Sequence, residues 1–430
     1  VPVKGTLEDI PELCNRYGIH SIIIAIPTLK GSKLNHVIDL CVSTHCAVQL
    51  LSDPQLVGSG APQQGAFREL NPADFLSRDE VTLDTDQISG YLTGKTVLVT
   101  GGGGSIGSEL CRQVMRFKPG KLLIFDIYEN CAYELLMELQ QKYGRDIPVT
   151  VLVGSIRDKK RLDEVFETYH PTVVFHAAAH KHVPLMEVSP AEAVKNNVLG
   201  TKNLLVSASE HDVERFVQLS TDKAVNPTSV MGCTKRICEM LIQTFAGNTD
   251  MKCVAVRFGN VLGSHGSVIP LFEAQIKKGG PVTLTDPNIE RYFMTIPEAA
   301  QLVLQAGALA ESGNIYVLDM GEPVKIMDLA KQLIRFYGYE PGVNMEIKIV
   351  GLRPGEKLYE ELMMDEEQDK MRRTQHNKIF VASPRSIDLA EFYGQLQELA
   401  EAAQHNDEGV VQQLAKMIST FTPTRQNLKL

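Results

Sequence analysis

The chain of 430 residues lacks any apolar run long enough to cross a membrane, since its longest conspicuous run covers only residues 22–26. It also lacks a signal peptide. A basic excess is absent too: the net charge of −9 argues against nucleic acid as the main partner, because nucleic-acid-binding proteins usually carry basic residues that neutralise phosphates. We therefore expect this chain to be soluble. Because it begins with Val1 rather than Met, we expect a processed form or part of a longer protein.

Closely spaced cysteine pairs are missing as well. The eight cysteines are scattered without a Cys-x-x-Cys spacing, and several fall inside apolar patterns, which predicts reduced, buried thiols and a cytosolic compartment. The chain has no internal repeat and no low-complexity tract. Its apolar content of 43% and charged content of 22% are those of a globular protein, and its length allows two or three hydrophobic cores.

From residue 95 onwards the chain shows a regular alternation of strand and helix patterns. This alternation predicts the α/β fold class, with a doubly wound parallel sheet of the extended Rossmann type. After residue 259 the pattern becomes irregular and rich in Gly and Pro, with helices expected at 297–310 and 325–337. We expect the six strands of the sheet near residues 96–100, 121–126, 149–153, 172–177, 214–220 and 252–258.

A glycine-rich loop follows the first of these strands and reads Thr-Gly-Gly-Gly-Gly-Ser-Ile-Gly. Gly101 permits a tight turn, Gly104 lets the backbone approach a pyrophosphate, and Gly107 lets the next helix pack on the strand. That helix starts with Ser105 and Ile106, so its N-terminus faces the anion. The glycine spacing by itself also suits an ordinary βα turn, but the strand before it and the helix after it favour a dinucleotide site.

Asp126 ends the second strand, about twenty residues after the loop, where an acid holds the adenine ribose diol. Its carboxylate would repel the 2′-phosphate of NADP, and the four residues that follow it include neither Arg nor Lys. We therefore predict that the cofactor is NAD.

Polar side chains follow the fifth strand at its carboxyl end. Thr221, Asp222 and Lys223 place a hydroxyl, a carboxylate and an ammonium close to where a bound nicotinamide would lie. A helix cap would be a simpler use of such a turn, but it needs only one of these side chains. Further along, Met231 and Lys235 stand four residues apart and would share one face of a helix.

These features resemble the extended branch of the short-chain dehydrogenase/reductase superfamily, which acts on nucleotide sugars. In that superfamily the places of Met231 and Lys235 hold a Tyr base and a Lys that binds the nicotinamide ribose, so the Tyr is absent here. The resemblance narrows to the UDP-N-acetylglucosamine 4,6-dehydratases of glycan and polysaccharide biosynthesis, in a subgroup where Met at this place is habitual. The motifs that carry it lie at 176–187, 196–201, 257–263, 291–299 and 352–357, within a match spanning about 93–365.

The resemblance implies a reaction in which the cofactor is recycled. NAD takes a hydride from C4 of the sugar, the resulting ketone acidifies the C5 proton, water leaves from C6, and the hydride returns to C6. Lys223 is implied as the base at C5, Asp222 as the acid at the 6-hydroxyl, Thr221 as a hydrogen-bond partner of the 4-oxygen and Lys235 as a ribose ligand. Lys223 then has to be neutral, which desolvation or cationic neighbours favour, and Asp222 has to stay protonated.

Met231 cannot accept a proton, so the base for the 4-hydroxyl stays open among Asp222, Lys223 and a water relayed through Thr221. The resemblance favours retention of configuration at C5. Three nearby histidines, at 176, 180 and 182, predict packing and substrate contacts rather than a metal site, because no Cys or carboxylate completes a ligand set. The resemblance further implies cofactor contacts from Ser155, Ile156, Ala177, Ala178, Ala179 and Asn197, and substrate contacts from Lys181, His182, Asn260, Arg291, Arg353 and Glu356.

The predicted organisation follows from the patterns and the resemblance together. In the subgroup the region resembling residues 1–90 lies between a membrane segment and the dehydratase, which implies that the full-length protein is anchored at the cytoplasmic face of the inner membrane by a preceding segment. We also expect a homo-oligomer, since helices flanking the sheet commonly pair such domains. The expected parts are an incomplete N-terminal α/β domain at 1–55, a linker at 56–92, the NAD-binding Rossmann domain at 93–260, a mostly substrate-binding smaller lobe at 261–385 and a helical tail at 386–430.

Two other functions fit parts of the sequence. A nucleotide-sugar 4-epimerase shares the fold, cofactor and substrate, but it needs the Tyr base and has no use for the Asp222–Lys223 pair. A non-catalytic NAD-binding module would explain Met231, yet it would leave Thr221, Asp222, Lys223 and Lys235 without a role.

Overall fold

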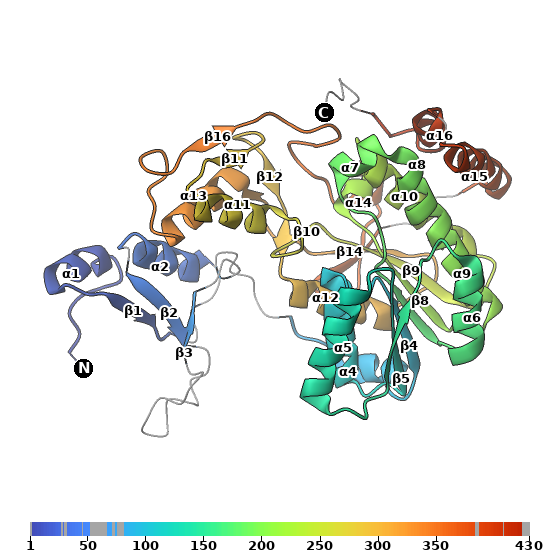
Figure 1. Ribbon diagram of the computed structural model, residues 1–430, viewed down its shortest axis with the longest axis horizontal. Coiled ribbons are helices and arrows are strands. Elements are labelled where there is room, and N and C mark those ends of the chain that lie inside the picture. Colours follow the sequence, from blue (N-terminus) through green and yellow to red (C-terminus); the bar gives the residue numbers. More distant parts are fainter. Residues whose placement is uncertain are drawn as a thin grey trace. The chain divides into compact units, whose positions relative to one another are not determined.

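The chain forms two compact units in the computed structural model (Figure 1). The first unit joins residues 1–80, 261–295 and 323–351, and the second joins residues 81–260, 296–322 and 352–430. The structure describes residues 2–26, 29, 32–44, 46–51, 67–70, 74, 81–382, 387–406 and 408–423.

The second unit is built on a nine-stranded sheet. Six of its strands are parallel and follow the order β6-β5-β4-β7-β8-β9, so the chain leaves β4 first to one side and later to the other. The predicted doubly wound parallel sheet is thereby confirmed, with its switch point between β4 and β7. The strands are β4 (Thr96–Thr100), β5 (Lys121–Asp126), β6 (Val149–Val153), β7 (Val173–His176), β8 (Arg215–Leu219) and β9 (Lys252–Arg257).

Three further strands extend the sheet beyond β9. β14 (Ile315–Leu318) pairs parallel with β9, β18 (Ile379–Ala382) pairs antiparallel with β14, and β17 (Arg372–Arg373) forms the edge. The sequence division placed all three in the smaller lobe. Each is a short run in an irregular region, so its partner comes from the tertiary arrangement rather than from a local βα repeat.

Helices cover both faces of this sheet, as a parallel sheet with buried strands requires. On one face α12 contacts both α3 and α4, and on the other α9 contacts both α6 and α10, with α15 and α16 outside them (Figure 1). Within the described part of the chain no helix is long and apolar enough to cross a membrane. The bounds are α3 (Thr85–Leu92), α4 (Ser105–Arg116), α5 (Glu129–Tyr143), α6 (Lys159–Tyr169), α9 (Gly200–Glu210), α10 (Val230–Ala246), α12 (Ile296–Ala308), α15 (Leu389–Gln404) and α16 (Val410–Met417).

Helix α3 lies within residues 56–92, which the sequence predicted to be a linker. Asp84 caps the helix by accepting a hydrogen bond from the backbone N–H of Gln87 at 3.0 Å. The Tyr91 hydroxyl donates to the carbonyl of Leu304 in α12 at 2.8 Å. Residues 85–92 therefore belong to the packed Rossmann unit. Most of the rest of the predicted linker lies outside the described residues.

The first unit combines residues that the sequence divided between an N-terminal domain and a smaller lobe. Ile38, Phe272 and Leu333, each 0–1% exposed, belong to one continuous hydrophobic core. Helices α2 and α13 contact each other directly, which joins the two segments. The main elements are α1 (Ile10–Tyr17), β1 (Ser21–Ile24), α2 (Ser32–Val42), β2 (Ala47–Leu51), β3 (Phe67–Glu69), α11 (Val268–Lys277), β11 (Val282–Leu284), β12 (Glu290–Arg291), β15 (Val324–Lys325), α13 (Ile326–Phe336) and β16 (Ile347–Ile349).

Candidate active site

The glycine loop adopts a conformation that only small residues allow. Gly101 has a φ of 66°, and a Cβ at this position would lie 2.6 Å from the backbone nitrogen of Ala178. A Cβ on Gly107 would collide with the Gly101 carbonyl, which accepts a hydrogen bond from the Gly104 N–H at 3.0 Å. Helix α4 then begins at Ser105, as expected. The N-terminus of a 12-residue helix thus faces a close backbone turn, which is the geometry of a phosphate cradle.

A buried histidine ties the two strands of the switch point together. The ring nitrogens of His176, at the end of β7, lie 2.7 Å from the hydroxyl of Thr100 and 2.9 Å from that of Thr201. Burial, together with the nearby Lys235 ammonium, lowers the pKa of His176 to about 3, so the ring is neutral at ordinary pH. This histidine is therefore a packing and hydrogen-bonding residue beneath the loop. Ala177, Ala178 and Ala179 continue the chain from it along the glycine turn.

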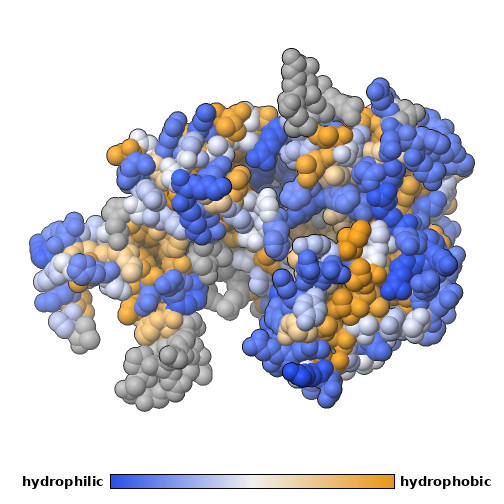
Figure 2. Space-filling view, viewed as in Figure 1, coloured by the Kyte–Doolittle hydropathy of each residue, from blue (hydrophilic) through white to orange (hydrophobic). Residues whose placement is uncertain are grey.

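Asp126 lies beside the glycine loop at the end of β5. Its two oxygens accept hydrogen bonds from the backbone N–H groups of Gly103 and Tyr128, each at 2.9 Å. A carboxylate has about four acceptor positions, so it can still take the hydroxyls of a ribose. Ile127 and Val153, which follow β5 and end β6, are 71% and 49% exposed. The visible face of the second unit carries an apolar patch beside α5 (Figure 2). Exposed apolar side chains near an acid suit a flat adenine ring.

Ser155 and Ile156, expected to contact adenine, lie in the turn after β6. Ile156 is 3% exposed, and a Cβ on Gly200 would lie 2.7 Å from its Cδ1, so its side chain packs into the core under α9. The Ser155 hydroxyl accepts a hydrogen bond from the Arg157 N–H at 3.2 Å.

Lys235 is buried without a hydrogen-bond partner for its ammonium among the residues that the structure describes, although it is only 7% exposed. Burial lowers the pKa of this lysine. A buried cation without acceptors is costly, so the position suits incoming oxygen atoms such as ribose hydroxyls. Met231, one turn earlier on α10, is 4% exposed. The cradle, Asp126 and this orphaned ammonium together fit a dinucleotide.

The turn after β8 brings its three functional side chains into contact. The Thr221 hydroxyl donates to Asp222 Oδ1 at 2.8 Å, and Lys223 Nζ lies 3.0 Å from the same oxygen. Asp222 is fully buried, and its Oδ2 has no hydrogen-bond partner within the described ranges. Lys223 also donates to the side-chain oxygen of Asn260 at 3.3 Å. The structure therefore joins Asn260, expected at the substrate, to the predicted catalytic turn.

Glu360 is a member of this cluster that sequence reasoning missed. Its Oε1 lies 3.8 Å from Lys223 Nζ, and its side chain is 4% exposed. The signal available was an acid four residues after Glu356, in a segment without helical or strand periodicity. Sequence reasoning offered desolvation or cationic neighbours as ways to keep the lysine neutral. Asp222 and Glu360, which contact Lys223, are carboxylates instead.

Asn197, expected at the cofactor, holds the loop after β7. Its side-chain oxygen accepts from the His180 N–H at 2.8 Å, and its amide donates to the His180 carbonyl and to the Thr234 hydroxyl, each at 3.0 Å. Both amide donors are therefore used inside the protein. Lys181 and His182 lie in the same loop and are exposed.

The remaining substrate candidates fall in two places. Arg353 is exposed, and its backbone N–H donates to Glu356 Oε2 at 3.1 Å. Gly355 between them, with a φ of 77°, packs so closely that a Cβ there would lie 2.8 Å from the Cβ of Ser229, the N-cap of α10. This pair therefore lies at the start of the helix that carries Lys235. Arg291 belongs to the first unit, where it is 8% exposed and donates to the Glu290 carbonyl at 2.7 Å.

Residues 97–384 match the family model described as Polysaccharide biosynthesis protein. The chain is also 53% identical over 366 residues to the capsular polysaccharide biosynthesis protein CapD of Staphylococcus aureus. That alignment covers 84% of this chain and 61% of the relative, so the chain spans less than two thirds of the relative's length. The chain belongs to the polysaccharide biosynthesis protein family.

Other matches of this family member connect it with nucleotide-sugar enzymes. It is 33% identical to an inverting UDP-N-acetylglucosamine 4,6-dehydratase of Campylobacter jejuni, with 62% of this chain and 76% of that protein covered. UDP-glucose 4-epimerases of Rickettsia species match at similar identity. The X-ray structure of Pen from Bacillus thuringiensis has a TM-score of 0.63 and 34% identity, covering 69% of this chain and 90% of its own. These likenesses agree with the extended Rossmann fold.

A buried ion cluster lies directly behind the catalytic turn in this family member. Arg257, at the end of β9, donates to Glu239 on α10 at 2.8 and 3.0 Å and to Glu367 at 2.8 Å. Ser220, the residue before Thr221, donates to the same Glu239 at 2.7 Å. Burial opposes ionisation of Glu239, but Arg257 and Arg236 outweigh it and hold its pKa at about 2. The cluster therefore fixes the turn to its neighbours through charge-assisted hydrogen bonds.

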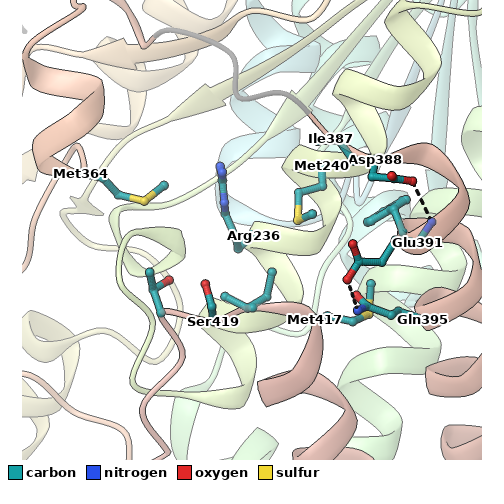
Figure 3. A pocket seen from close by; sticks show the side chains of 12 residues that line it. Arg236, Met240, Met364, Ile387, Asp388, Glu391, Gln395, Met417 and Ser419 are labelled. Carbon is teal, nitrogen blue, oxygen red and sulfur yellow. Dashed lines mark hydrogen bonds between the residues drawn. The ribbon is translucent and has the colours of Figure 1, made fainter.

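A separate cavity of about 240 Å³ lies between α10 and the C-terminal helices (Figure 3). Arg236 projects from α10 into this space, between Met364 and Met240 (Figure 3). None of the residues expected at the cofactor or substrate lines it. The candidate active site is therefore the strand-end cluster rather than this cavity.

The described residues hold one group with metal-ligand spacing, formed by Asp163, Glu210 and His211. Lys159 Nζ lies 2.6 Å from Asp163 and 2.9 Å from Glu210, so one ammonium already pairs with both carboxylates. The group is better explained as a surface ion pair than as a metal site.

Proposed function

We propose that the protein is a lyase that dehydrates UDP-N-acetylglucosamine to UDP-4-keto-6-deoxy-N-acetylglucosamine with bound NAD. One observation carries the proposal: Asp222 and Lys223 touch at 3.0 Å at the carboxyl end of β8, in a turn that packs against α10, the helix that carries the buried Lys235. An acid and a base in contact are what removal of water from adjacent carbons requires. NAD, when bound at the glycine loop, supplies the means to oxidise C4 and to return the hydride to C6.

The hydrogen bonds of the turn support a route for each proton. The Thr221 hydroxyl, hydrogen-bonded to the 4-oxygen, passes the proton of the 4-hydroxyl to Asp222, to which it already donates. Asp222 then gives that proton to the 6-oxygen, which leaves as water. Among the three bases left open by the sequence, this route favours Asp222 acting through Thr221.

Lys223 handles the second proton. The C5–H bond breaks, its proton moves to the neutral Nζ, and its electron pair enters the C4 carbonyl system. The same lysine returns the proton to C5 once C6 has been reduced. Because one base serves one face of the ring, this route gives retention at C5. The pair ends the cycle with the protons it began with.

Binding roles complete the proposal. Lys235 takes the nicotinamide ribose hydroxyls and Asp126 the adenine ribose diol, while Asn260, Arg353 and Glu356, all in the second unit, recognise the UDP half. The 33% identity to the Campylobacter jejuni dehydratase supports the substrate and the loss of water. That enzyme is named as inverting, so retention at C5 rests on the single base and on the resemblance. A homo-oligomer at the cytoplasmic face of the membrane, within glycan biosynthesis, is part of the same proposal and rests on the resemblance.

A 4-epimerase is the second candidate, favoured by the Rickettsia relatives at 36% and 35% identity. Epimerisation at C4 breaks no bond at C5 or C6, so it leaves the Asp222–Lys223 contact without a task. Met231 also occupies the place of the base that an epimerase needs.

Mass spectrometry of the protein incubated with UDP-N-acetylglucosamine separates these functions. A product lighter by one water supports the dehydratase. An isomer of unchanged mass supports the epimerase, and absence of any product supports a non-catalytic NAD-binding module. Bound NAD is measured in the same preparation after acid release, so that loss of cofactor is not mistaken for lack of activity.

A further inference from the structure

Glu360 reaches the catalytic turn from a distant part of the chain. It lies in the segment after Arg353 and Glu356, yet its carboxylate is 3.8 Å from the Lys223 ammonium. Its side chain is 4% exposed, compared with 21% for that of Lys223. Solvent therefore screens this pair far less than it screens a surface ion pair.

The buried ion cluster holds both partners in place. Arg257 donates to the carbonyl of Leu362, two residues after Glu360, at 3.0 Å, and to Glu367 at 2.8 Å. Through Glu239 the same arginine is linked to Ser220, three residues before Lys223. Glu360 and Lys223 thus extend from two segments that one guanidinium clamps together. Their approach is a property of the fold rather than of two flexible side chains.

The three groups around Lys223 Nζ differ in what they can do during proton transfer. Asn260 presents an amide oxygen, which carries no charge. Asp222, from the same turn, has to hold a proton for the 6-oxygen while Lys223 takes the C5 proton. Glu360 brings a second carboxylate to 3.8 Å from Nζ. When Nζ gains its positive charge, Glu360 is the carboxylate positioned to stabilise that charge.

We propose that Glu360 is a positioning residue for the lysine base, which aims Nζ at C5 and stabilises the ammonium formed when the C5 proton is taken. The inference rests on the proposed dehydration and adds to it a residue outside the Thr221–Lys223 turn. A charge already in place stabilises the transition state more than the ground state, in which Lys223 is neutral.

The pH dependence of turnover distinguishes this role from a structural one. A carboxylate beside Lys223 favours the ammonium, which is inactive as a base. Without it the neutral amine forms at lower pH, so the acidic limb of the kcat profile moves downwards in pH. Loss of packing alone would lower kcat without moving the limb.

The test compares Glu360→Gln, Glu360→Asp and Glu361→Gln with the wild type over a range of pH. For Glu360→Gln we expect kcat to fall about tenfold, KM and bound NAD to stay unchanged, and the acidic limb to move down by about one pH unit. Glu360→Asp keeps the charge and should keep the limb. Glu361→Gln is the matched control, because Glu361 is 46% exposed and pairs with Lys357 at 3.0 Å.

Each outcome decides the inference. A wild type that dehydrates, with a Glu360→Gln profile that does not move, overturns the role of Glu360 and leaves the proposed function standing. A wild type that forms no dehydrated product overturns both. Cofactor content and circular dichroism show whether Glu360→Gln keeps its NAD and its fold. If it does not, the Glu360→Asp variant decides. An acidic limb that moves down in pH in this variant contradicts the inference, and an acidic limb that stays in place supports it.

Discussion

The cofactor cradle and the catalytic turn lie at the same edge of one sheet but are assembled in different ways. The cradle comes from one continuous stretch, in which β4, the glycine loop, α4 and β5 follow one another from Thr96 to Asp126. The turn becomes a site only when Asn260 and Glu360 join Lys223 from 37 and 137 residues away. A local motif of this kind is readable from sequence, whereas convergence of distant segments is readable only from the fold.

The largest effect is expected from the catalytic turn. Lys223→Met removes the base while keeping an unbranched side chain, so we expect dehydration to fall about 10³-fold with bound NAD retained. The measurement is product formation by mass spectrometry beside cofactor content. Lys357→Met, which removes an ammonium paired with exposed Glu361, is the control and should keep most activity. If Lys223→Met turns over near the wild-type rate, another residue has to be the base at C5.

A substitution in the cradle should have the opposite effect to one in the turn, because it should remove the bound NAD. In Gly101→Ala the new Cβ meets the Ala178 backbone at 2.6 Å in a left-handed conformation. We expect a stability loss of about 3 kcal/mol and a preparation without NAD. Denaturant unfolding and cofactor content measure both. Gly90→Ala is the matched control, because a Cβ there meets nothing within 4 Å, and NAD retained by Gly101→Ala would contradict the cradle.

His176, which lies beneath the cradle and near Lys235, should make the stability of the cradle region depend on pH. Its pKa is about 3 in the folded state and near 6.5 when unfolded, so below pH 6.5 the unfolded chain binds a proton that the folded one refuses. Stability from this group is therefore lost as pH falls. Between pH 6.5 and 5 the loss is about 2 kcal/mol. The measurement is the free energy of unfolding at pH 7 and at pH 5. The difference between these two values should be about 2 kcal/mol smaller in His176→Gln than in the wild type. In the control His405→Gln, which changes an exposed histidine, it should equal that of the wild type.

The smallest effect is expected at Met231, where the superfamily pattern and this chain differ. If Asp222 acting through Thr221 removes the proton of the 4-hydroxyl, Met231→Tyr supplies an unnecessary base. We expect turnover within a few-fold of the wild type, a change of about 1 kcal/mol or less in the barrier. Steady-state rates with UDP-N-acetylglucosamine measure it. A large gain would show that the ordinary place of the base is still the limiting one.

Prediction from sequence succeeded where structure repeats locally. The six parallel strands lie within one residue of their expected ends, because each is an apolar run bounded by turn residues. It was incomplete where strands are short and partners distant, as for β14, β17 and β18. It also could not show which neighbours Asn197 bonds, because a motif indicates that a residue matters without showing its hydrogen-bond partners.

The predicted domain boundaries also failed where the packing partners are distant in the sequence. The sequence separates residues 1–55 from the lobe after 261 by more than 200 positions, yet Ile38 and Leu333 lie in one core. A hydrophobic face records that a helix is covered but not by which partner, since the hydrophobic effect is not directional. That information enters only when the whole chain is packed.

The amino-acid sequence alone determined the α/β class, the positions of the parallel strands, the glycine cradle and the presence of Thr221, Asp222 and Lys223 at a strand end. These depend on periodicity and turn chemistry over fewer than about twenty residues. The tertiary structure alone decided that Glu360 and Asn260 contact Lys223 and that Arg257 holds the segment containing Glu360 in place. It also decided that Lys235 is buried without a hydrogen-bond acceptor among the described residues. These depend on charges meeting in a low-dielectric interior, where position in space rather than in sequence sets the energy.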